Sequence, residues 1–248
     1  MTTGILYLIP NTLGSSQTGE DLPAIIPDNV LQVTSSLDYF IVENAKTARA
    51  HLNRVARLLP LKTPLQQIEM AQLNVKTDKS TLPALLAPIL AGKNAGLISE
   101  AGVPAVADPG ADLVRLAHEK GITVKPLVGP SSLLLSLMAS GLNGQSFAFN
   151  GYLPVDADTR QKRIKALEAR SAIDHQTQLF IETPYRNEML LKSLCQALAP
   201  STWLCIATDV SLAEESIETL PVSQWRKRLK EGKLPDFNRR PTVFLFLA

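Results

Sequence analysis

Short apolar runs alternate with longer segments of helical periodicity along the whole chain, and this alternation limits the possible fold more than any other feature. In the longer segments, apolar residues recur three and four positions apart, as on one face of a helix. A strand–helix–strand rhythm is typical of a mostly parallel sheet with helices on both faces. In the first half, the predicted strands are 4–9, 39–42, 95–99 and 122–128, and the predicted helices are 43–59, 82–91, 108–120 and 131–140.

The second half repeats the rhythm with its own strands and helices. Its predicted strands are 147–150, 178–182, 203–208 and 242–247, and its predicted helices are 160–169, 187–198 and 224–231. We therefore predict an α/β protein of two domains, residues 1–129 and 130–248, the first with a mostly parallel sheet and the second with a mixed sheet. The segment 11–29 is rich in Ser, Thr, Pro, Gly and Asp, which predicts a loop long enough to suggest a function.

Composition excludes several classes of protein. Hydrophobic residues make up 45% of the chain, which is enough for a packed core and too much for a disordered chain. The net charge of +2 leaves no basic field over the whole protein, although a local basic patch stays possible. The two cysteines have no C-x-x-C spacing, and no targeting or membrane-spanning segment is expected. We expect a cytoplasmic protein with reduced cysteines and no membrane partner.

The loop Ser99-Glu-Ala-Gly-Val-Pro-Ala-Val-Ala-Asp-Pro-Gly110 follows a predicted buried strand and leads into a predicted helix. In an open α/β sheet, ligands bind at this carboxyl edge of the strands. Its small residues let a ligand approach the backbone, and free N–H groups at a helix start favour an anion. Taken alone, Gly and Pro are more often the punctuation of a tight connection, and Asp108 is first of all a helix cap with Pro109 in the first turn.

A second loop, Leu127-Val-Gly-Pro-Ser-Ser132, also follows a predicted strand and opens a helix. Ser131 and Ser132 either cap that helix or hold a ligand with their hydroxyl groups, and capping alone is the simpler explanation. Both loops, however, are expected at the same edge of the sheet, where one ligand contacts both.

Several well-known sites have no counterpart in the sequence. It contains no G-x-G-x-x-G after the first strand, no G-x-x-x-x-G-K-[ST] and no G-x-S-x-G. The histidines His51, His118 and His175 are widely separated, so no metal site is expected.

Taken in order, several short motifs resemble those of the tetrapyrrole methylase superfamily, and most closely its branch of ribosomal RNA small subunit methyltransferase I enzymes. The similarity is strongest over residues 96–141 and extends through most of the chain. The motifs are Leu6-Tyr-Leu-Ile-Pro10, Ser99-Glu-Ala-Gly-Val-Pro104, Asp108-Pro-Gly110, Val128-Gly-Pro-Ser-Ser132, Ser140-Gly-Leu142, Asn150-Gly-Tyr-Leu-Pro154 and Phe180-Ile-Glu-Thr-Pro-Tyr-Arg186.

The resemblance implies a homodimer of two-domain chains with S-adenosylmethionine held in a cleft between the domains. It assigns cofactor contacts to the end of the first strand and to the loop after residue 98. Further contacts are assigned to the loop 127–132 and to two segments of the second domain. The residues so assigned are Pro10, Ser99, Glu100, Ala101, Gly102, Val103, Asp108, Pro130, Ser131, Ser132, Thr183, Pro241 and Thr242.

The chain departs from the RNA-modifying branch mainly where the acceptor is expected. The branch has Ala-Glu-Asp-Thr-Arg after the second strand, where this chain has Val42-Glu-Asn-Ala-Lys46. Further departures fall at Asn11-Thr-Leu-Gly-Ser15, Asn74-Val-Lys-Thr-Asp-Lys79 and Thr208-Asp-Val-Ser-Leu212. Methyl transfer is therefore expected, whereas the methyl acceptor, RNA or a small molecule, is left open.

Direct displacement at the cofactor's methyl group needs alignment and a base for the acceptor's proton. Glu43 is the candidate base, although an acidic residue that simply begins a helix explains it equally well. Lys46 is the candidate for positioning an anionic acceptor, and a solvated surface lysine is the alternative.

Three functions stay open at this point. A methyltransferase acting on RNA is supported only by the basic stretch 225–230 with Arg239 and Arg240, which a solvated helix face explains as well. A methyltransferase acting on a small molecule, including a tetrapyrrole, is the second. A non-catalytic module that binds the cofactor and regulates a partner is the third.

Overall fold

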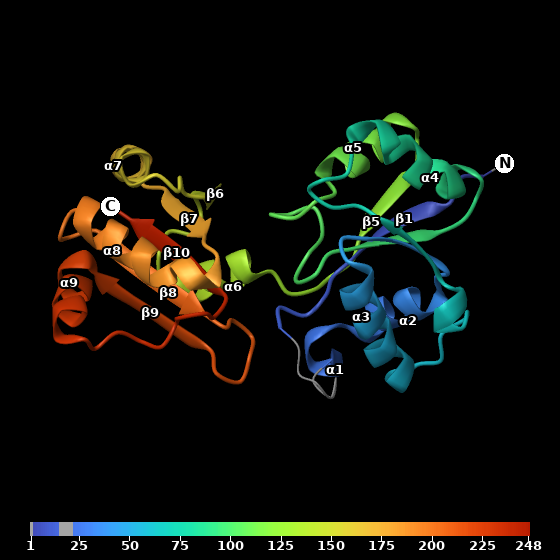
Figure 1. The fold of residues 1–248 in the computed structure, drawn as a ribbon, viewed down its shortest axis with the longest axis horizontal. Helices are drawn as coiled ribbons and strands as arrows, with labels where there is room; N and C mark the ends of the chain where they lie inside the picture. Colours follow the sequence, from blue (N-terminus) through green and yellow to red (C-terminus); the bar gives the residue numbers. More distant parts are fainter. Residues whose placement is uncertain (1, 15–21) are drawn as a thin grey trace. The chain divides into compact units, whose positions relative to one another are not determined.

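The computed structural model describes residues 2–14 and 22–248, which form two compact units, Met1–Ser131 and Ser132–Ala248 (Figure 1). Part of the loop predicted at 11–29, residues 15–21, lies outside the described residues. The rest of that prediction is wrong in part, because Leu22–Ile25 and Asp28–Ser36 are the helices α1 and α2. Each unit has its own five-stranded sheet, so the predicted fold class of two α/β domains is confirmed.

In the first unit all five strands are parallel, as predicted for this half of the chain. The strands are β1 (Ile5–Ile9), β2 (Tyr39–Val42), β3 (Glu69–Gln72), β4 (Ala95–Ile98) and β5 (Thr123–Pro126), in the order β3-β2-β4-β1-β5. Because every neighbouring pair is parallel, the carboxyl ends of all five strands lie at one edge of the sheet. We call this edge the carboxyl edge.

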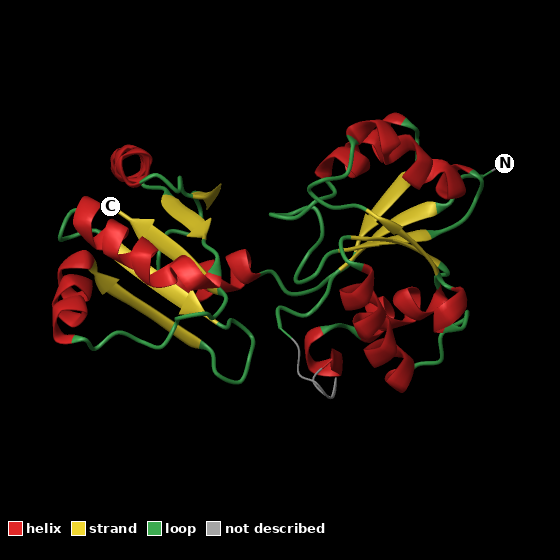
Figure 2. Ribbon diagram, viewed as in Figure 1, coloured by secondary structure: helices red, strands yellow, loops and turns green. Residues whose placement is uncertain are grey.

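Helices cover both faces of this sheet (Figure 2). Besides α1 and α2 they are α3 (Ala45–Leu58), α4 (Leu82–Leu90) and α5 (Ala111–Glu119), with short 3₁₀ turns at Leu65–Gln67 and Lys79–Thr81. Strand residues alternate between the faces: Ile41 and Leu97 pack with α4 and α5, whereas Phe40 and Ile98 pack with α3. This two-sided burial explains why β2 and β4 are continuous apolar runs in the sequence.

The start of α5 corrects one prediction. The helix begins at Ala111, and its N-cap position is Gly110, with no side-chain cap. Asp108 therefore does not cap it. The positive φ values of Ala107 (63°) and Gly110 (141°) keep the preceding residues out of the helical conformation.

The second unit has a mixed sheet, as predicted. Its strands are β6 (Phe147–Tyr152), β7 (Thr177–Ile181), β8 (Trp203–Thr208), β9 (Ser216–Pro221) and β10 (Thr242–Leu247), in the order β6-β7-β10-β8-β9. Only β6 and β7 pair in parallel. Its helices are α6 (Ser132–Ser140), α7 (Ala157–Asp174), α8 (Asn187–Ala197) and α9 (Val222–Glu231), with a 3₁₀ turn at Pro184–Arg186.

The core of this unit lies between the sheet and the helices α7, α8 and α9. Phe180, Phe244 and Trp225 are fully buried there, and the Trp225 indole N–H donates a 2.8 Å hydrogen bond to the carbonyl oxygen of Leu204. Helix α6 packs against β8, β9 and β10 on the opposite face, where Thr219 donates to the carbonyl oxygen of Ser140. Both cysteines of the chain are buried and free. None of the described helices is long and apolar enough to cross a membrane.

Candidate functional site

The loops that follow β1 and β4 are joined at the carboxyl edge of the first unit. Asn11, which is only 4% exposed, connects them. Its backbone N–H donates to the carbonyl oxygen of Gly102 at 2.8 Å, and its side-chain amide donates to the carbonyl oxygen of Glu100 at 2.9 Å. The predicted cofactor loop is thereby fixed against the end of the first strand.

The loop that follows β5 reaches the same place. A Cβ atom added to Gly129 would lie 2.1 Å from the Cβ of Pro10, so only glycine lets the two loops pass this closely. Gly102 has a φ of +66°. A Cβ atom added to Gly102 would lie 3.6 Å from the carbonyl oxygen of Pro130. The structure therefore brings together Pro10, Pro130 and the loop Ser99–Val103, as the sequence analysis expected of one ligand site.

Glu43 lies directly after β2 at this edge. One of its carboxylate oxygens accepts a 3.2 Å hydrogen bond from the backbone N–H of Glu100. Thr47, in the first turn of α3, donates to the Glu100 carboxylate at 3.0 Å. The N-cap of α3 is Asn44, whose side chain accepts from the N–H of Lys46. Glu43 thus stands outside the helix, and the prediction that the helix begins there is wrong.

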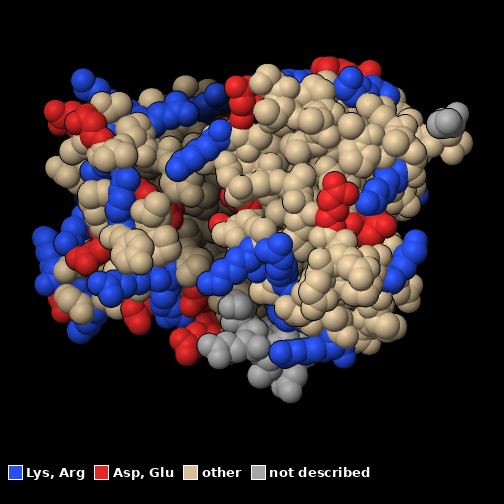
Figure 3. All heavy atoms as spheres, turned by 45° about the vertical axis from the view of Figure 1, so that its right-hand side comes forward, with Lys and Arg blue, Asp and Glu red and all other residues tan. Residues whose placement is uncertain are grey.

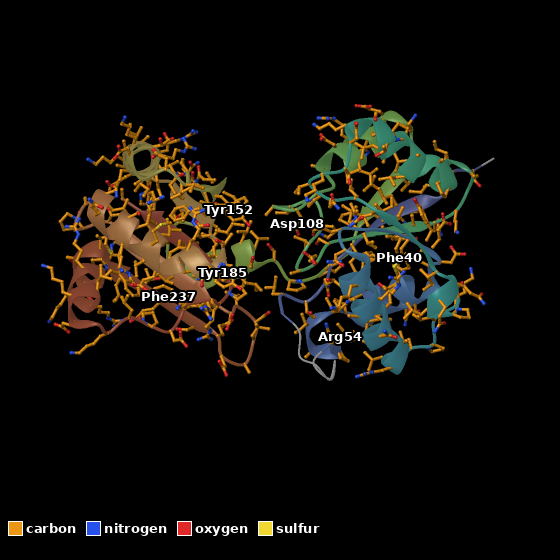
Figure 4. All side chains as sticks on the ribbon, viewed as in Figure 1. Phe40, Arg54, Asp108, Tyr152, Tyr185 and Phe237 are labelled. Carbon is orange, nitrogen blue, oxygen red and sulfur yellow. The ribbon has the colours of Figure 1, made fainter. Side chains whose placement is uncertain are left out.

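Asp108 shows that the edge is electrostatically negative. Its pKa is raised to about 6, first because burial disfavours the ionised carboxylate and then because the charges of Glu43 and Glu100 repel it, while a hydrogen bond from Ser99 acts in the opposite direction. Asp108 lies on the loop between β4 and α5 (Figure 4). A group of positive charge at this edge would relieve the repulsion among the carboxylates.

A pocket of about 430 Å³ opens beside Asp108 within the first unit. Its walls are the loop after β3, with Asn74 and Thr77, and the start of α5. The loop after β3 is one of the segments in which the chain departs from the RNA-modifying branch. Among the described residues, no cluster of His, Cys, Asp and Glu has the arrangement of a metal site.

Lys46 lies in the first turn of α3 with an exposed side chain. No ion pair joins it to a described residue. It therefore stands two residues from the N-cap of α3 and three from Glu43, available to an anion that reaches the edge.

In the second unit, Thr183 and Thr242 lie near each other because β7 and β10 are antiparallel neighbours, with Ile181 opposite Val243. Thr183 follows the buried Glu182, whose carboxylate accepts from the Thr183 N–H at 2.7 Å and from its hydroxyl at 3.3 Å. The other carboxylate oxygen of Glu182 lies 3.0 Å from Nη2 of Arg186. This ion pair fixes the turn that carries Thr183.

Pro241 and Thr242 belong to a hydrogen-bonded group at the start of β10. The fully buried Asn187 donates to the carbonyl oxygen of Arg240 at 2.8 Å and to the hydroxyl of Thr242 at 3.2 Å. Thr208 lies 3.2 Å from the same hydroxyl, and the N–H of Asp209 donates to the carbonyl oxygen of Pro241. Pro241 and Thr242 are thus held in place by a network of hydrogen bonds.

Ser131 and Ser132 lie where the two units divide, with Ser132 as the first residue of α6. Both are half-buried. Sequence reasoning did not single out Asn11, Gly129 or Glu182, although Gly129 and Glu182 are inside quoted motifs. A glycine between two residues of a predicted ligand loop is a signal of close backbone approach, whereas nothing local marks Asn11, because its partners are about ninety residues away.

The basic stretch of α9 has structural partners. Arg226 donates hydrogen bonds of 2.6 and 2.7 Å to the carbonyl oxygens of Cys195 and Leu198. Arg228 pairs with Glu218 and stacks on the Trp225 ring. Arg240 pairs with Asp209 at 2.6 Å. Three of the six cations that supported RNA binding in the sequence therefore hold the second unit together.

The chain is similar to proteins named ribosomal RNA small subunit methyltransferase I. It is 30% identical over 240 residues to that of Escherichia coli O157:H7, covering 96% of this chain and 74% of the relative. It is 30% identical over 223 residues to that of Vibrio cholerae, with 89% and 69% covered, and 28% identical over 195 residues to that of Bacillus subtilis, with 79% and 60% covered. No protein-family profile matches the chain.

Solved structures with the same fold are tetrapyrrole methyltransferases. The methyltransferase CobJ superposes with a TM-score of 0.62 at 15% identity, covering 99% of this chain and 95% of CobJ. The uroporphyrin-III C-methyltransferase of Thermus thermophilus complexed with S-adenosylhomocysteine superposes with a TM-score of 0.56 at 17% identity, with 99% and 98% covered. At these identities the likeness concerns the fold.

Proposed function

The chain belongs to the ribosomal RNA small subunit methyltransferase I family, and on that premise we propose that it methylates a ribose hydroxyl group of RNA. It is a methyltransferase of the tetrapyrrole methylase type, and S-adenosylmethionine is its methyl donor. We propose also the roles of the side chains below, and a homodimer as the working form.

The electrostatics of the carboxyl edge fit the cofactor. S-adenosylmethionine carries a positive sulfonium and a positive ammonium group, and the carboxylates of Glu43 and Glu100 lie close enough to Asp108 to repel its charge. The Gly102 backbone and its small neighbours leave room for close approach. The observation that carries the proposal is the gathering of these carboxylates at the joined loops, where Glu43 accepts from the N–H of Glu100 and Asp108 is partly buried beside them.

Two sets of residues are proposed to hold the cofactor, one from each unit. In the first unit they are Pro10, Ser99, Glu100, Ala101, Gly102, Val103, Asp108, Pro130 and Ser131; in the second they are Ser132, Thr183, Pro241 and Thr242. When bound, S-adenosylmethionine supplies a methyl group that its positive sulfur has already activated. No covalent bond to the protein is then required, and the residues contribute mainly alignment, for which ~7–11 kcal/mol of barrier lowering is attainable in model reactions.

Glu43 is proposed to take the proton from the acceptor hydroxyl. Its carboxylate is held at the end of β2 by the N–H of Glu100, so the group is fixed before any acceptor arrives. Lys46, three residues later, is proposed to hold a phosphate of the acceptor. Both residues follow β2 at the carboxyl edge, Glu43 just before α3 and Lys46 in its first turn.

The RNA acceptor is supported by the relatives, whose names give ribosomal RNA as their substrate. The net charge of +2 neither favours nor opposes RNA binding. Figure 3 shows Lys and Arg side chains mixed with Asp and Glu over the face in view, without a field of one sign. RNA recognition would therefore depend on a local group of cations.

The test is transfer of a labelled methyl group from S-adenosylmethionine to small-subunit ribosomal RNA, offered both free and in small ribosomal subunits, with uroporphyrinogen III as the small-molecule alternative. We expect label in RNA only, and mapping of the label to a ribose. Glu43→Gln should lose transfer while keeping cofactor affinity in calorimetry, and Glu119→Gln, at the end of α5, is the control. Label in uroporphyrinogen and none in RNA would refute the acceptor. Sedimentation equilibrium tests the homodimer.

A further inference from the structure

A long stretch of the chain carries positive charge and no negative charge. Residues 44–68 contain no Asp or Glu, although the whole chain has 23 acidic residues in 248, or about one in eleven. The cations of this stretch are Lys46, Arg49, Arg54, Arg57 and Lys62. Most of the stretch is α3.

Helix α3 separates its residues sharply by face. Ala48, His51, Leu52 and Val55 are buried against the sheet and α2. The exposed residues recur at helical spacing. Those on the opposite side are cationic, amide or small, namely Lys46, Arg49, Ala50, Asn53, Ala56 and Arg57, and the last residue of the helix, Leu58, is 41% exposed. We call Lys46, Arg49 and Arg57, which lie on this side, the basic face of α3.

The beginning of this face is not neutralised by the described part of the chain. Neither Lys46 nor Arg49 forms an ion pair with a described residue. The nearest acidic groups are already engaged, since Glu43 accepts from the N–H of Glu100 and Glu100 accepts from Thr47. Some surface cations of the unit are paired, as Lys79 is with Asp112 and Lys93 with Glu69, whereas Lys120 and Lys125 form no ion pair with a described residue and serve below as the comparison.

A further cation stands beside the start of α3. Strands β2 and β3 pair with Val42 opposite Gln72, and the Gln72 amide donates to the carbonyl oxygen of Glu43 at 3.3 Å. Lys46 comes four residues after one strand end and Lys76 four residues after the other. Lys76 is exposed, on the loop that Asn74 and Thr77 hold in a tight turn.

We propose that the basic face of α3, together with Lys76, binds the phosphate backbone of the RNA acceptor. This inference rests on the proposed function. From Lys46 to Arg57 the helix rises about 16 Å, at ~1.5 Å per residue. A nucleic-acid strand carries a charge every ~3.4 Å of its axis, so it matches such a row, whereas a compact anion contacts one end of it.

The position of the face relative to the candidate base gives it a function in methyl transfer. Lys46 follows Glu43 by three residues, and Asn44, the N-cap of α3, lies between them. A strand whose phosphate rests on Lys46 brings a neighbouring ribose to the carboxyl edge. Arg49 and Arg57 then set the direction of the strand along α3, away from that edge.

The experiment measures binding of a short fluorescent single-stranded RNA to the full chain as salt is raised from about 50 to about 200 mM. The test variant is Lys46→Gln with Arg49→Gln. The matched control is Lys120→Gln with Lys125→Gln, which removes the same charge from exposed positions after α5 and on the edge strand β5. Calorimetry with S-adenosylmethionine and the labelled-methyl assay are run on all three proteins.

We expect the test variant to bind RNA more weakly and to lose about 1.4 from the magnitude of the slope of log affinity against log salt, ~0.7 for each lost contact with a single strand. Its cofactor affinity should equal that of the wild type and of the control. An unchanged slope in the test variant, while the wild type binds and methylates RNA, overturns this surface and leaves the proposed function standing. A wild type that neither binds nor methylates RNA overturns both the surface and the proposed function. Binding of uroporphyrinogen through Lys46 and Arg49 would also overturn both. Equal losses in test and control variants also refute the surface.

Discussion

Removal of Arg186 should destabilise the second unit, because it leaves a buried carboxylate without its counter-charge. The side chain of Glu182 is 1% exposed and that of Arg186 is 28% exposed. One oxygen of Glu182 is satisfied by Thr183, but the other has only the guanidinium, 3.0 Å away and without the alignment of a true hydrogen bond. Breaking a buried pair from one side costs ~3–5 kcal/mol, and the exposure and poor alignment here favour about 3 kcal/mol.

Tryptophan fluorescence during urea unfolding measures this effect in the right unit, since both tryptophans of the chain, Trp203 and Trp225, lie in the second unit. A loss of about 3 kcal/mol lowers the unfolding midpoint by about 1–3 M urea for ordinary m-values of ~1–3 kcal/mol/M. The variant is Arg186→Met. Its control is Arg170→Met, which breaks an exposed pair with Asp174 on α7 and should cost at most ~0.5 kcal/mol.

A double variant separates loss of charge from loss of packing. Glu182→Gln keeps an oxygen that accepts from the Thr183 N–H but removes the negative charge. Combined with Arg186→Met, it should be more stable than Arg186→Met alone, because no buried charge is then unpaired. If Arg186→Met unfolds at the same urea concentration as Arg170→Met, the carboxylate is not held by the guanidinium and the reasoning fails.

Three other changes test different parts of the structure. Gly129→Ala places a Cβ 2.1 Å from that of Pro10, so the two loops must separate. We expect ~1–3 kcal/mol of destabilisation and weaker cofactor binding in calorimetry. The control is Gly144→Ala, because no atom lies within 4 Å of the added Cβ there. Asp108→Asn should stabilise the first unit above pH 6 and not near pH 4. The pKa of Asp108 is raised from 3.8 to about 6 in the folded protein, so its ionisation disfavours folding only as the pH rises through that interval. Hydrogen exchange of wild type and variant at the two pH values checks the sign, and an equal gain in protection at both would contradict it. Arg226→Met removes two charged hydrogen bonds at the end of α8. It should lower the free energy of unfolding by ~1.5–3 kcal/mol in the fluorescence assay without changing RNA affinity. Loss of RNA binding with unchanged stability would show instead that α9 contacts RNA.

Both strands that the sequence missed lack buried residues. The central strands β2 and β4 are fully buried and appear in the sequence as short apolar runs. The missed strands, β3 and β9, are end strands, and none of their residues is buried; the other end strands, β5 and β6, have no buried residue either but were predicted. An end strand is held by its backbone partner on one side, so its side chains need no apolar pattern.

The same division holds for the candidate site. Small residues and prolines after apolar runs sufficed to predict two ligand loops at one edge, because parallel strands place their carboxyl ends together. The binding roles of Pro10, Ser99–Val103 and Pro130 stay predictions. The sequence could not show that Asp108 leaves the helix uncapped, that Glu182 holds the turn of Thr183, or that Asn11 joins two loops.

The ionic partners of the basic residues could be known only from the tertiary structure. In the sequence, the stretches that form α3 and α9 are both basic and both have helical periodicity. Folding places carbonyl oxygens and Glu218 against the arginines of α9, and it leaves Lys46 and Arg49 without a described ionic partner. The local pattern indicated the central strands and most of the helices, because their apolar periodicity depends on neighbours in the chain. Only the tertiary structure decided which charges are satisfied internally and which remain for a ligand, because their partners lie far away in sequence.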